Sequence, residues 1–235
     1  YIAANRSEIT GVSMLGVIGQ SKTINNTYKD IWGDSADLVY PTGAESWEVV
    51  SADANDTSAG TGIQTVTITS LDASYNEQTQ IVSMNGTTPV ALTGTHFRCN
   101  SFAAATVGTV GQAGVAAGEI TLRVASAGAT RSVILLGETG SFASHYTVPL
   151  GKSALWMQTS VFSPKNEDAN VRSRFQLAGA GPFYIGGDVP IYQNSVVHPF
   201  RTGLILPAKS EFLHQAKTDN AGPTSVTVIA ELEVR

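Results

Sequence analysis

The stretch Thr65-Val66-Thr67-Ile68-Thr69 places hydroxyl-bearing and aliphatic side chains at alternate positions. A period of two residues indicates a half-buried β-strand, because successive side chains of a strand point to opposite faces of the sheet. Residues 225–234 show the same alternation, with Val226 and Val228 on one face and Thr227 on the other. Both halves of the chain therefore predict antiparallel sheets with one buried face.

Further strands are separated by turn residues such as Asn85-Gly86, both of which tolerate positive φ. In the first half we expect strands at 47–51, 65–69, 78–84, 96–105 and 119–125, with a Gly/Ala-rich link at 107–118. In the second half we expect them at 132–136, 145–148, 154–162, 171–177, 184–192, 197–206, 211–217 and 225–234. Because no segment alternates strands with long amphipathic helices, an α/β fold is disfavoured.

The predicted fold is all-β and has three parts. Residues 1–44 form an N-terminal arm, residues 45–128 a smaller N-terminal β-domain, and residues 129–235 a C-terminal antiparallel β-sandwich of jelly-roll type. In the arm, Ile9, Val12, Leu15 and Ile18 recur about every three residues, as in a short helix, but the glycines between them disfavour a stable one. We expect an extended arm with one helical turn, lying on a neighbouring subunit.

The composition limits the possible partners. Charged residues make up 14% of the 235 residues, the net charge is −5, and the charges form no blocks. Nucleic-acid binding requires a stripe of Lys and Arg, and a membrane span requires about 20 apolar residues; the sequence has neither, so we expect no nucleic-acid or membrane partner. A chain with few charges also presents fewer side chains that resist burial in a subunit contact. Cys99 is the single cysteine, so an intrachain disulfide is excluded and a buried, inert thiol is expected.

Three patterns invite a catalytic or metal-binding interpretation, and none is complete. Gly33-Asp34-Ser35 resembles the start of an esterase signature, but the Leu that usually follows the Ser and a downstream Asp-x-x-His are missing. The oxygen-rich loop at 53–58 lacks the Gly and the closing Glu of a calcium loop. The four histidines are widely separated, with no zinc-ligand spacing, and His145 and His214 are candidates to face each other across a sheet.

A fourth pattern, the carboxylates Glu167 and Asp168, lies in a predicted loop. A glycosidase needs two carboxylates about 5–9.5 Å apart in a cleft, and a loop does not predict that arrangement. We therefore predict that the chain is not an enzyme and that it binds no cofactor or metal.

Four aromatic residues are candidate contacts with a partner protein or with a glycan. They are Trp32, Tyr40, Trp47 and Tyr75. Aromatic side chains in a β-protein more often lie in a core or an interface than in a sugar-stacking row. Both interpretations remain open at the level of sequence.

Four turn and strand elements occur in a distinctive order. They are residues 53–62 leading into Thr65-Val66-Thr67-Ile68, then Leu71-Asp72-Ala73-Ser74-Tyr75-Asn76-Glu77, then Asn85-Gly86-Thr87-Thr88-Pro89-Val90, and finally Tyr146-Thr147-Val148-Pro149-Leu150-Gly151-Lys152. This order is similar to that in virion structural proteins of tailed bacteriophages, where Ala is commoner at the position of Leu150. The resemblance covers residues 45–160 well and the rest loosely.

The resemblance implies a β-rich component of a phage particle. We expect a homotrimeric capsid decoration or cement protein that stabilises the shell by packing against the major capsid protein or other virion proteins. Its location would be the virion, assembled in the cytoplasm of the bacterial host. The alternative is a tail-associated or fibre module that binds host-surface glycan, and a secreted hydrolase using Ser35 is the last-ranked interpretation.

Overall fold

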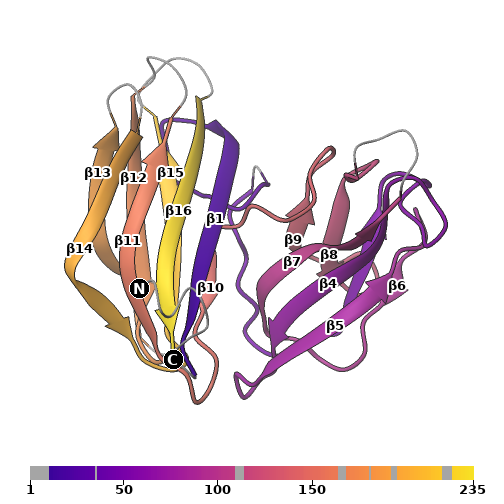
Figure 1. Ribbon diagram of the computed structural model, residues 1–235, viewed down its shortest axis with the longest axis horizontal. Coiled ribbons are helices and arrows are strands. Elements are labelled where there is room, and N and C mark those ends of the chain that lie inside the picture. The colour runs from indigo at the N-terminus through magenta and orange to yellow at the C-terminus, as the bar shows by residue number, and fades with distance from the viewer. Residues whose placement is uncertain are drawn as a thin grey trace. The chain divides into compact units, whose positions relative to one another are not determined.

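The computed structural model describes residues 11–34, 36–108, 114–163, 168–179, 181–191, 195–218 and 224–235. It confirms the all-β class, since the described residues form strands and turns and contain no helix (Figure 1). The chain divides into two compact units. The inserted unit comprises Leu38–Phe142, and the terminal unit combines Tyr1–Asp37 with Ala143–Arg235.

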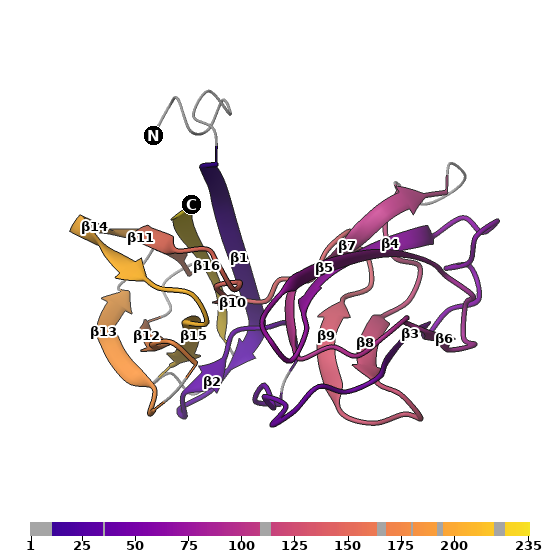
Figure 2. The same cartoon turned by 90° about the horizontal axis from the view of Figure 1, so that it is seen from below.

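The inserted unit consists of two antiparallel sheets, which Figure 2 shows as two layers. One sheet has the order β6-β3-β8-β9, built from β3 (Trp47–Ser51), β6 (Val90–Ala91), β8 (Ile120–Val124) and β9 (Thr130–Ile134). The other has the order β5-β4-β7, built from β4 (Ile63–Leu71), β5 (Glu77–Ser83) and β7 (Arg98–Val107). The Thr/aliphatic alternation of residues 65–69 lies in β4, the central strand of its sheet.

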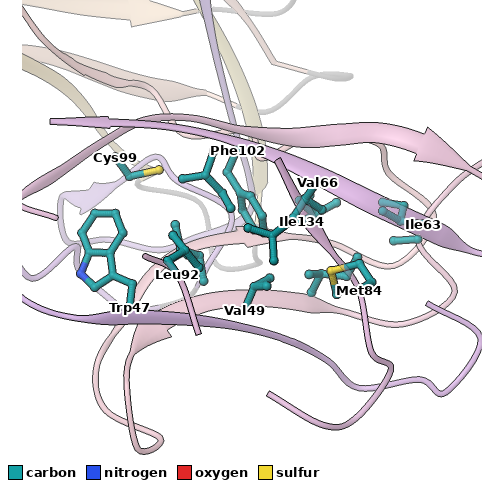
Figure 3. Close-up of a cluster of buried hydrophobic side chains, with 14 residues drawn as sticks. Trp47, Val49, Ile63, Val66, Met84, Leu92, Cys99, Phe102 and Ile134 are labelled. Atoms are coloured by element: carbon teal, nitrogen blue, oxygen red, sulfur yellow. The ribbon is translucent and has the colours of Figure 1, made fainter. Parts of the chain in front are cut away.

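The two sheets of the inserted unit share one hydrophobic core (Figure 3). Val66 and Ile68 of β4 enter it together with Phe102 of β7, and they pack with Trp47 and Val49 of β3. Cys99 belongs to the same cluster, as expected for an inert thiol. Because the aliphatic positions of β4 are buried here, its threonines face outward.

The terminal unit also consists of two antiparallel sheets. The first has the order β1-β16-β11-β14, with β1 (Ser13–Ile24), β16 (Thr224–Val234), β11 (Ala154–Phe162) and β14 (Ser195–Leu206). The second has the order β10-β15-β12-β13, with β10 (His145–Thr147), β15 (Glu211–Lys217), β12 (Ala169–Gln176) and β13 (Tyr184–Ile191). A short strand, β2 (Lys29–Asp30), also pairs with β15. The inward residues of both sheets form shared clusters, one around Trp156 and Phe212 and one around Val161 and Val171.

The N-terminal arm is the main prediction that the structure corrects. Residues 13–24 are a 12-residue strand, β1, which pairs along its length with β16 and contributes Val17 to the core. The approximate three-residue spacing of apolar side chains does not reveal this strand, because two of its buried inward positions, Gly19 and Ser21, carry no aliphatic side chain. Residues 1–10, which include Ile9 of the predicted helical turn, lie outside the described part of the chain.

The unit boundaries also differ from the predicted domains. The division falls after Asp37 and after Phe142 instead of after residues 44 and 128. The strand predicted at 132–136 corresponds to β9, which pairs with β8 and therefore belongs to the inserted unit. In the terminal unit β1 supplies a strand instead, by pairing with β16. The sequence does not predict this pairing, because β1 and β16 lie at opposite ends of the chain.

Candidate interaction surface

The outward side of the β5-β4-β7 sheet carries nine side chains in three rows. The rows run across the three strands as Ser83–Thr65–Thr106, Ile81–Thr67–Ala103 and Thr79–Thr69–Ser101. None of the nine is charged, and seven carry a hydroxyl. We call this set the hydroxyl face.

Hydroxyls of the hydroxyl face pair with one another across the strands. The Oγ1 atoms of Thr65 and Thr106 lie 2.7 Å apart, and those of Thr69 and Thr79 lie 3.3 Å apart. Such cross-strand pairs stabilise a sheet and fix the rotamers of its threonines. The result is a stiff, low surface on which Ile81, 70% exposed, is the one large apolar side chain among the nine.

Charges begin where the hydroxyl face ends. Glu77 is the first residue of β5 and Arg98 the first residue of β7, so both lie at the same end of the sheet. A partner that covers the three rows of the hydroxyl face would meet no charged side chain, so no ion would have to be desolvated there.

The other three sheets carry ions on their outer faces. In the β6-β3-β8-β9 sheet Arg123 donates to Glu48 at 2.7 Å, and in the β10-β15-β12-β13 sheet Arg172 pairs with Asp188 at 2.9 Å. In the remaining sheet, Glu233 of β16 alternates with the buried Leu232 and Val234 and pairs with the Arg235 side chain. The absence of charge therefore distinguishes the hydroxyl face from the outer faces of the other three sheets.

The structure does not bring the four predicted aromatic residues together. Trp32 is 2% exposed in the terminal unit, and its Nε1 donates to the carbonyl of Ala36 at 2.6 Å. Trp47 is 1% exposed and stacks on His96 with ring centroids 4.9 Å apart. Neither tryptophan is presented to a glycan or a partner by the folded chain, so for these two residues the contact prediction is wrong.

Tyr40 and Tyr75 do lie in one cluster, together with Phe97 and Arg98. The Arg98 guanidinium lies 3.9 Å from the Phe97 ring centroid and 5.0 Å from that of Tyr40. Tyr75 meets Phe97 edge-on with centroids 5.4 Å apart. We call these four residues the aromatic–arginine cluster, and all four are half-buried.

Tyr75 adopts a left-handed backbone conformation, with φ at +68°. This conformation costs a non-glycine residue on the order of 1 kcal/mol and persists only where neighbours enforce it. Asp72 does so here, because its carbonyl accepts from the Tyr75 N–H and its carboxylate accepts from Ser74 and Asn76. The hydrogen bond from the Asn76 side chain is the main reason that the pKa of Asp72 is lowered.

The catalytic interpretations find no support in the described residues. Ser35 and Glu167 lie outside them. His145 pairs with Leu213, so His145 and His214 point to opposite faces of their sheet and do not meet. The Cys99 thiol is buried, and burial raises its pKa to about 12, which leaves no reactive thiolate near neutral pH.

Each unit nevertheless contains a buried Ser–His pair beside a tryptophan. In the terminal unit, Ser144 Oγ lies 2.6 Å from His214 Nδ1, and the imidazole meets Trp156 edge-on. In the inserted unit, Ser70 Oγ lies 2.8 Å from His96 Nδ1, whose ring stacks on Trp47. All four members are 1% exposed or less, so substrate cannot reach them and their role is structural. Sequence reasoning missed both pairs because their partners are 70 and 26 residues apart, with no motif around them.

The oxygen-rich loop at 53–58 is held by Asp56. This carboxylate is fully buried and accepts from Ser51 Oγ at 2.6 Å and from the backbone N–H of Ile63 at 2.7 Å. The N–H groups of Ala117 and Gly118, each at 3.0 Å, complete its shell. Asp56 thus ties two loops to β3, and among the described residues no group of three or more His, Cys, Asp or Glu is placed to hold a metal ion.

Within the part of the chain that the structure describes, no helix is long and apolar enough to span a membrane. A scan against protein-family models found no match, and a search of curated proteins found none either. Among solved structures, one match is described as "Structure of infectious bursal disease virus Gx strain". It has a TM-score of 0.22 and 11% sequence identity, and it covers 94% of this chain and 70% of that chain. A TM-score this low carries no argument about fold or function.

Proposed function

We propose that the chain is a structural protein of a tailed-bacteriophage particle and, within it, a capsid decoration or cement protein. Its partners would be the major capsid protein or other virion proteins, and further copies of itself in a homotrimer. It would act by adhesion, adding buried surface where neighbouring shell subunits are pulled apart, with no catalytic step. Its location would be the virion, assembled in the host cytoplasm.

The hydroxyl face is the observation that carries this proposal. A surface exposed to water is usually interspersed with charges, whereas the centre of a protein–protein contact is depleted of Lys, Glu and Asp. The three rows of the hydroxyl face lack charge, while the outer faces of the other sheets carry ion pairs. A rigid and uncharged sheet face suits permanent cover by another subunit.

The strand order of the terminal unit supports the same proposal. The unit has eight strand positions. In chain order the first is β1, the second is occupied jointly by β2 and β10, which pair with successive parts of β15, and the other six are β11 to β16. Numbered one to eight, the two sheets read 1-8-3-6 and 2-7-4-5, in which the connections cross between the sheets as in a double Greek key. We therefore assign the terminal unit to the jelly-roll type of β-sandwich, a fold used by viral capsid domains and by lectins. The inserted unit then lies in the chain between β2 and β10.

Attachment to shells is the direct test. Purified chain is incubated with empty shells that lack it, bound protein is measured by co-sedimentation, and the shells are then heated. We expect saturable binding, a higher temperature of shell opening, and a trimer by light scattering. The variants Ile81→Lys and Ile205→Lys change isoleucines that are 70% and 69% exposed, one on β5 and one on β14, and so report which unit carries the attachment. Chain that neither trimerises nor binds shells would refute the proposal.

A tail-associated glycan-binding module is the second candidate, favoured by the aromatic–arginine cluster. Tyr75 is held in its left-handed conformation by Asp72, and residues kept strained in this way are concentrated at binding sites. A glycan array comparing Tyr75→Ala with Tyr184→Ala, a half-exposed tyrosine of β13, tests it. Dose-dependent binding lost only in Tyr75→Ala would favour this function; no binding by the unmodified chain would eliminate it.

A further inference from the structure

We propose that the hydroxyl face is the contact between two copies of this chain, which pair face to face about a twofold axis running along β4. The inference deepens the proposed function, on which its setting in a particle rests, by naming the subunit that covers this face. Such a contact would join copies that belong to neighbouring oligomers.

Four of the seven hydroxyls of the hydroxyl face keep an internal partner when the face is buried. The hydroxyls of Thr65 and Thr106 already pair at 2.7 Å, and those of Thr69 and Thr79 at 3.3 Å. A buried hydroxyl is expensive only when it loses its hydrogen bond to water and gains nothing in return. These pairs keep an internal partner when the water is removed.

The absence of charge favours a second copy of this chain as the occupant. A partner surface that carries Lys or Glu would lose its hydration against this face without meeting an opposite charge. Of the chain's own outer sheet faces, three carry the ion pairs Glu48–Arg123, Arg172–Asp188 and Glu233–Arg235. Among the sheet faces that the structure describes, the hydroxyl face is the one whose chemistry matches itself.

Side-chain size identifies the direction of the axis. Ile81 and Ala103 occupy the two ends of the middle row, on either side of Thr67. Ala103 forms a β-bridge with Gly140, and a Cβ built on Gly140 would lie 3.7 Å from the Cβ of Ala103. Alanine and glycine therefore lie side by side at this end of the row, which carries the smallest side chains. A twofold axis along β4 places β5 of one copy over β7 of the other, so that each Ile81 meets an Ala103. An axis across the strands would instead oppose the two Ile81 side chains, large against large.

Area sets the strength of the contact. Three strands and three rows span about 10 Å by 14 Å between the outermost Cα atoms. This is less than the roughly 800 Å² that each partner contributes to a stable complex. Pairing of free chains is therefore expected only at high concentration, and it becomes effective when several copies are held together in an oligomer.

Sedimentation equilibrium of the full chain over a wide concentration range tests the pairing. We expect reversible association whose dissociation constant rises at least about thirtyfold in Ile81→Lys, which buries an unpaired charge, and severalfold in the milder Ile81→Thr. The matched variant Ile205→Lys should leave it unchanged, since Ile205 lies on β14 of the other unit. Loss of association in all three variants, or in none, or its absence in the unmodified chain, would overturn the inference.

Cross-linking tests the direction of the axis. Ile81→Cys and Ala103→Cys chains are mixed and treated with a short bismaleimide; the native Cys99 is buried and does not compete. We expect the mixture to cross-link much faster than either variant alone, and faster self-linking of Ile81→Cys would overturn the assigned axis. These measurements use the chain without shells, so pairing without shell attachment would refute the cement role and keep the contact, whereas attachment without pairing would do the reverse.

Discussion

Acidification is expected to destabilise the terminal unit through His214. The imidazole is fully buried, with Ser144 Oγ 2.6 Å from Nδ1 and the rings of Trp156 and Phe212 against it. Burial disfavours the charged form and lowers the pKa of His214 from 6.5 to about 3. The folded chain therefore keeps His214 neutral at pH values where the unfolded chain protonates it.

The size of the effect follows from linkage between proton binding and folding. A difference of about 3.5 pKa units, at about 1.36 kcal/mol each, gives about 5 kcal/mol when fully expressed. Because the folded pKa is the lower one, this stability is complete above pH 6.5 and is lost progressively as the pH falls towards 3. At pH 4.5 the protonated form of His214 outnumbers the neutral form by about 100 to 1 in the unfolded chain. About 2.7 kcal/mol of the free energy of unfolding is therefore already lost at this pH.

Urea denaturation followed by tryptophan fluorescence measures this loss. His214→Gln retains a hydrogen-bonding side chain near Ser144 but cannot take up a proton. Between pH 7.5 and 4.5 the free energy of unfolding should fall by about 2.7 kcal/mol more in the unmodified chain than in His214→Gln. Ser144→Ala keeps the imidazole and should keep its pH dependence. Equal pH dependence in His214→Gln and the unmodified chain would show that the buried imidazole does not act in this way.

Three further predictions concern the two cores. Asp56→Asn turns an amide N–H₂ towards backbone donors and should lower the free energy of unfolding of the inserted unit by about 3 kcal/mol in urea denaturation; a change under 1 kcal/mol would contradict the role of Asp56 in tying the two loops to β3. Gly19→Ala should lower the melting temperature, since its Cβ would lie 2.1 Å from the Cβ of Ser144, whereas Gly16→Ala, with nothing within 4 Å, should not; equal melting temperatures would refute the close approach. Cys99 should react with a thiol reagent at pH 8 only after unfolding, because burial raises its pKa to about 12; rapid labelling of folded chain would exclude that burial.

Strand positions were predictable from the sequence wherever one face of a strand is buried. In β16, Val226, Val228, Ala230 and Leu232 alternate with exposed or half-exposed residues, as the pattern indicates. In β1 the inward positions include Gly19 and Ser21, which lack the aliphatic signal, so the sequence predicts an arm where the structure has a strand. Strands β2 and β6, of two residues each, are too short to produce any periodicity.

The candidate surface was only partly predictable. The outward threonines of β4 follow from their spacing, but that spacing does not tell which residues lie beside them. Ser83 and Thr106 join Thr65 in one row because β5 and β7 pair with opposite edges of β4, and their register is set by tertiary pairing. The aromatic candidates show the same limit. The sequence around Trp47 does not distinguish a buried tryptophan from an exposed one, and in the structure residues from several strands bury it.

The all-β class, most strand positions, the turn residues and the shortage of charge can be predicted from the amino-acid sequence alone. These are local or compositional properties, which follow from the stiffness of β-branched side chains, the two-residue period of a strand and the freedom of Gly and Asn at turns. Three features become visible only in the folded chain: β1 closes a sheet with β16, residues 38–142 are inserted into the terminal unit, and nine uncharged side chains lie on one face. These features depend on pairing between segments distant in the chain, whose free energy comes from buried contacts and leaves no mark on either segment alone.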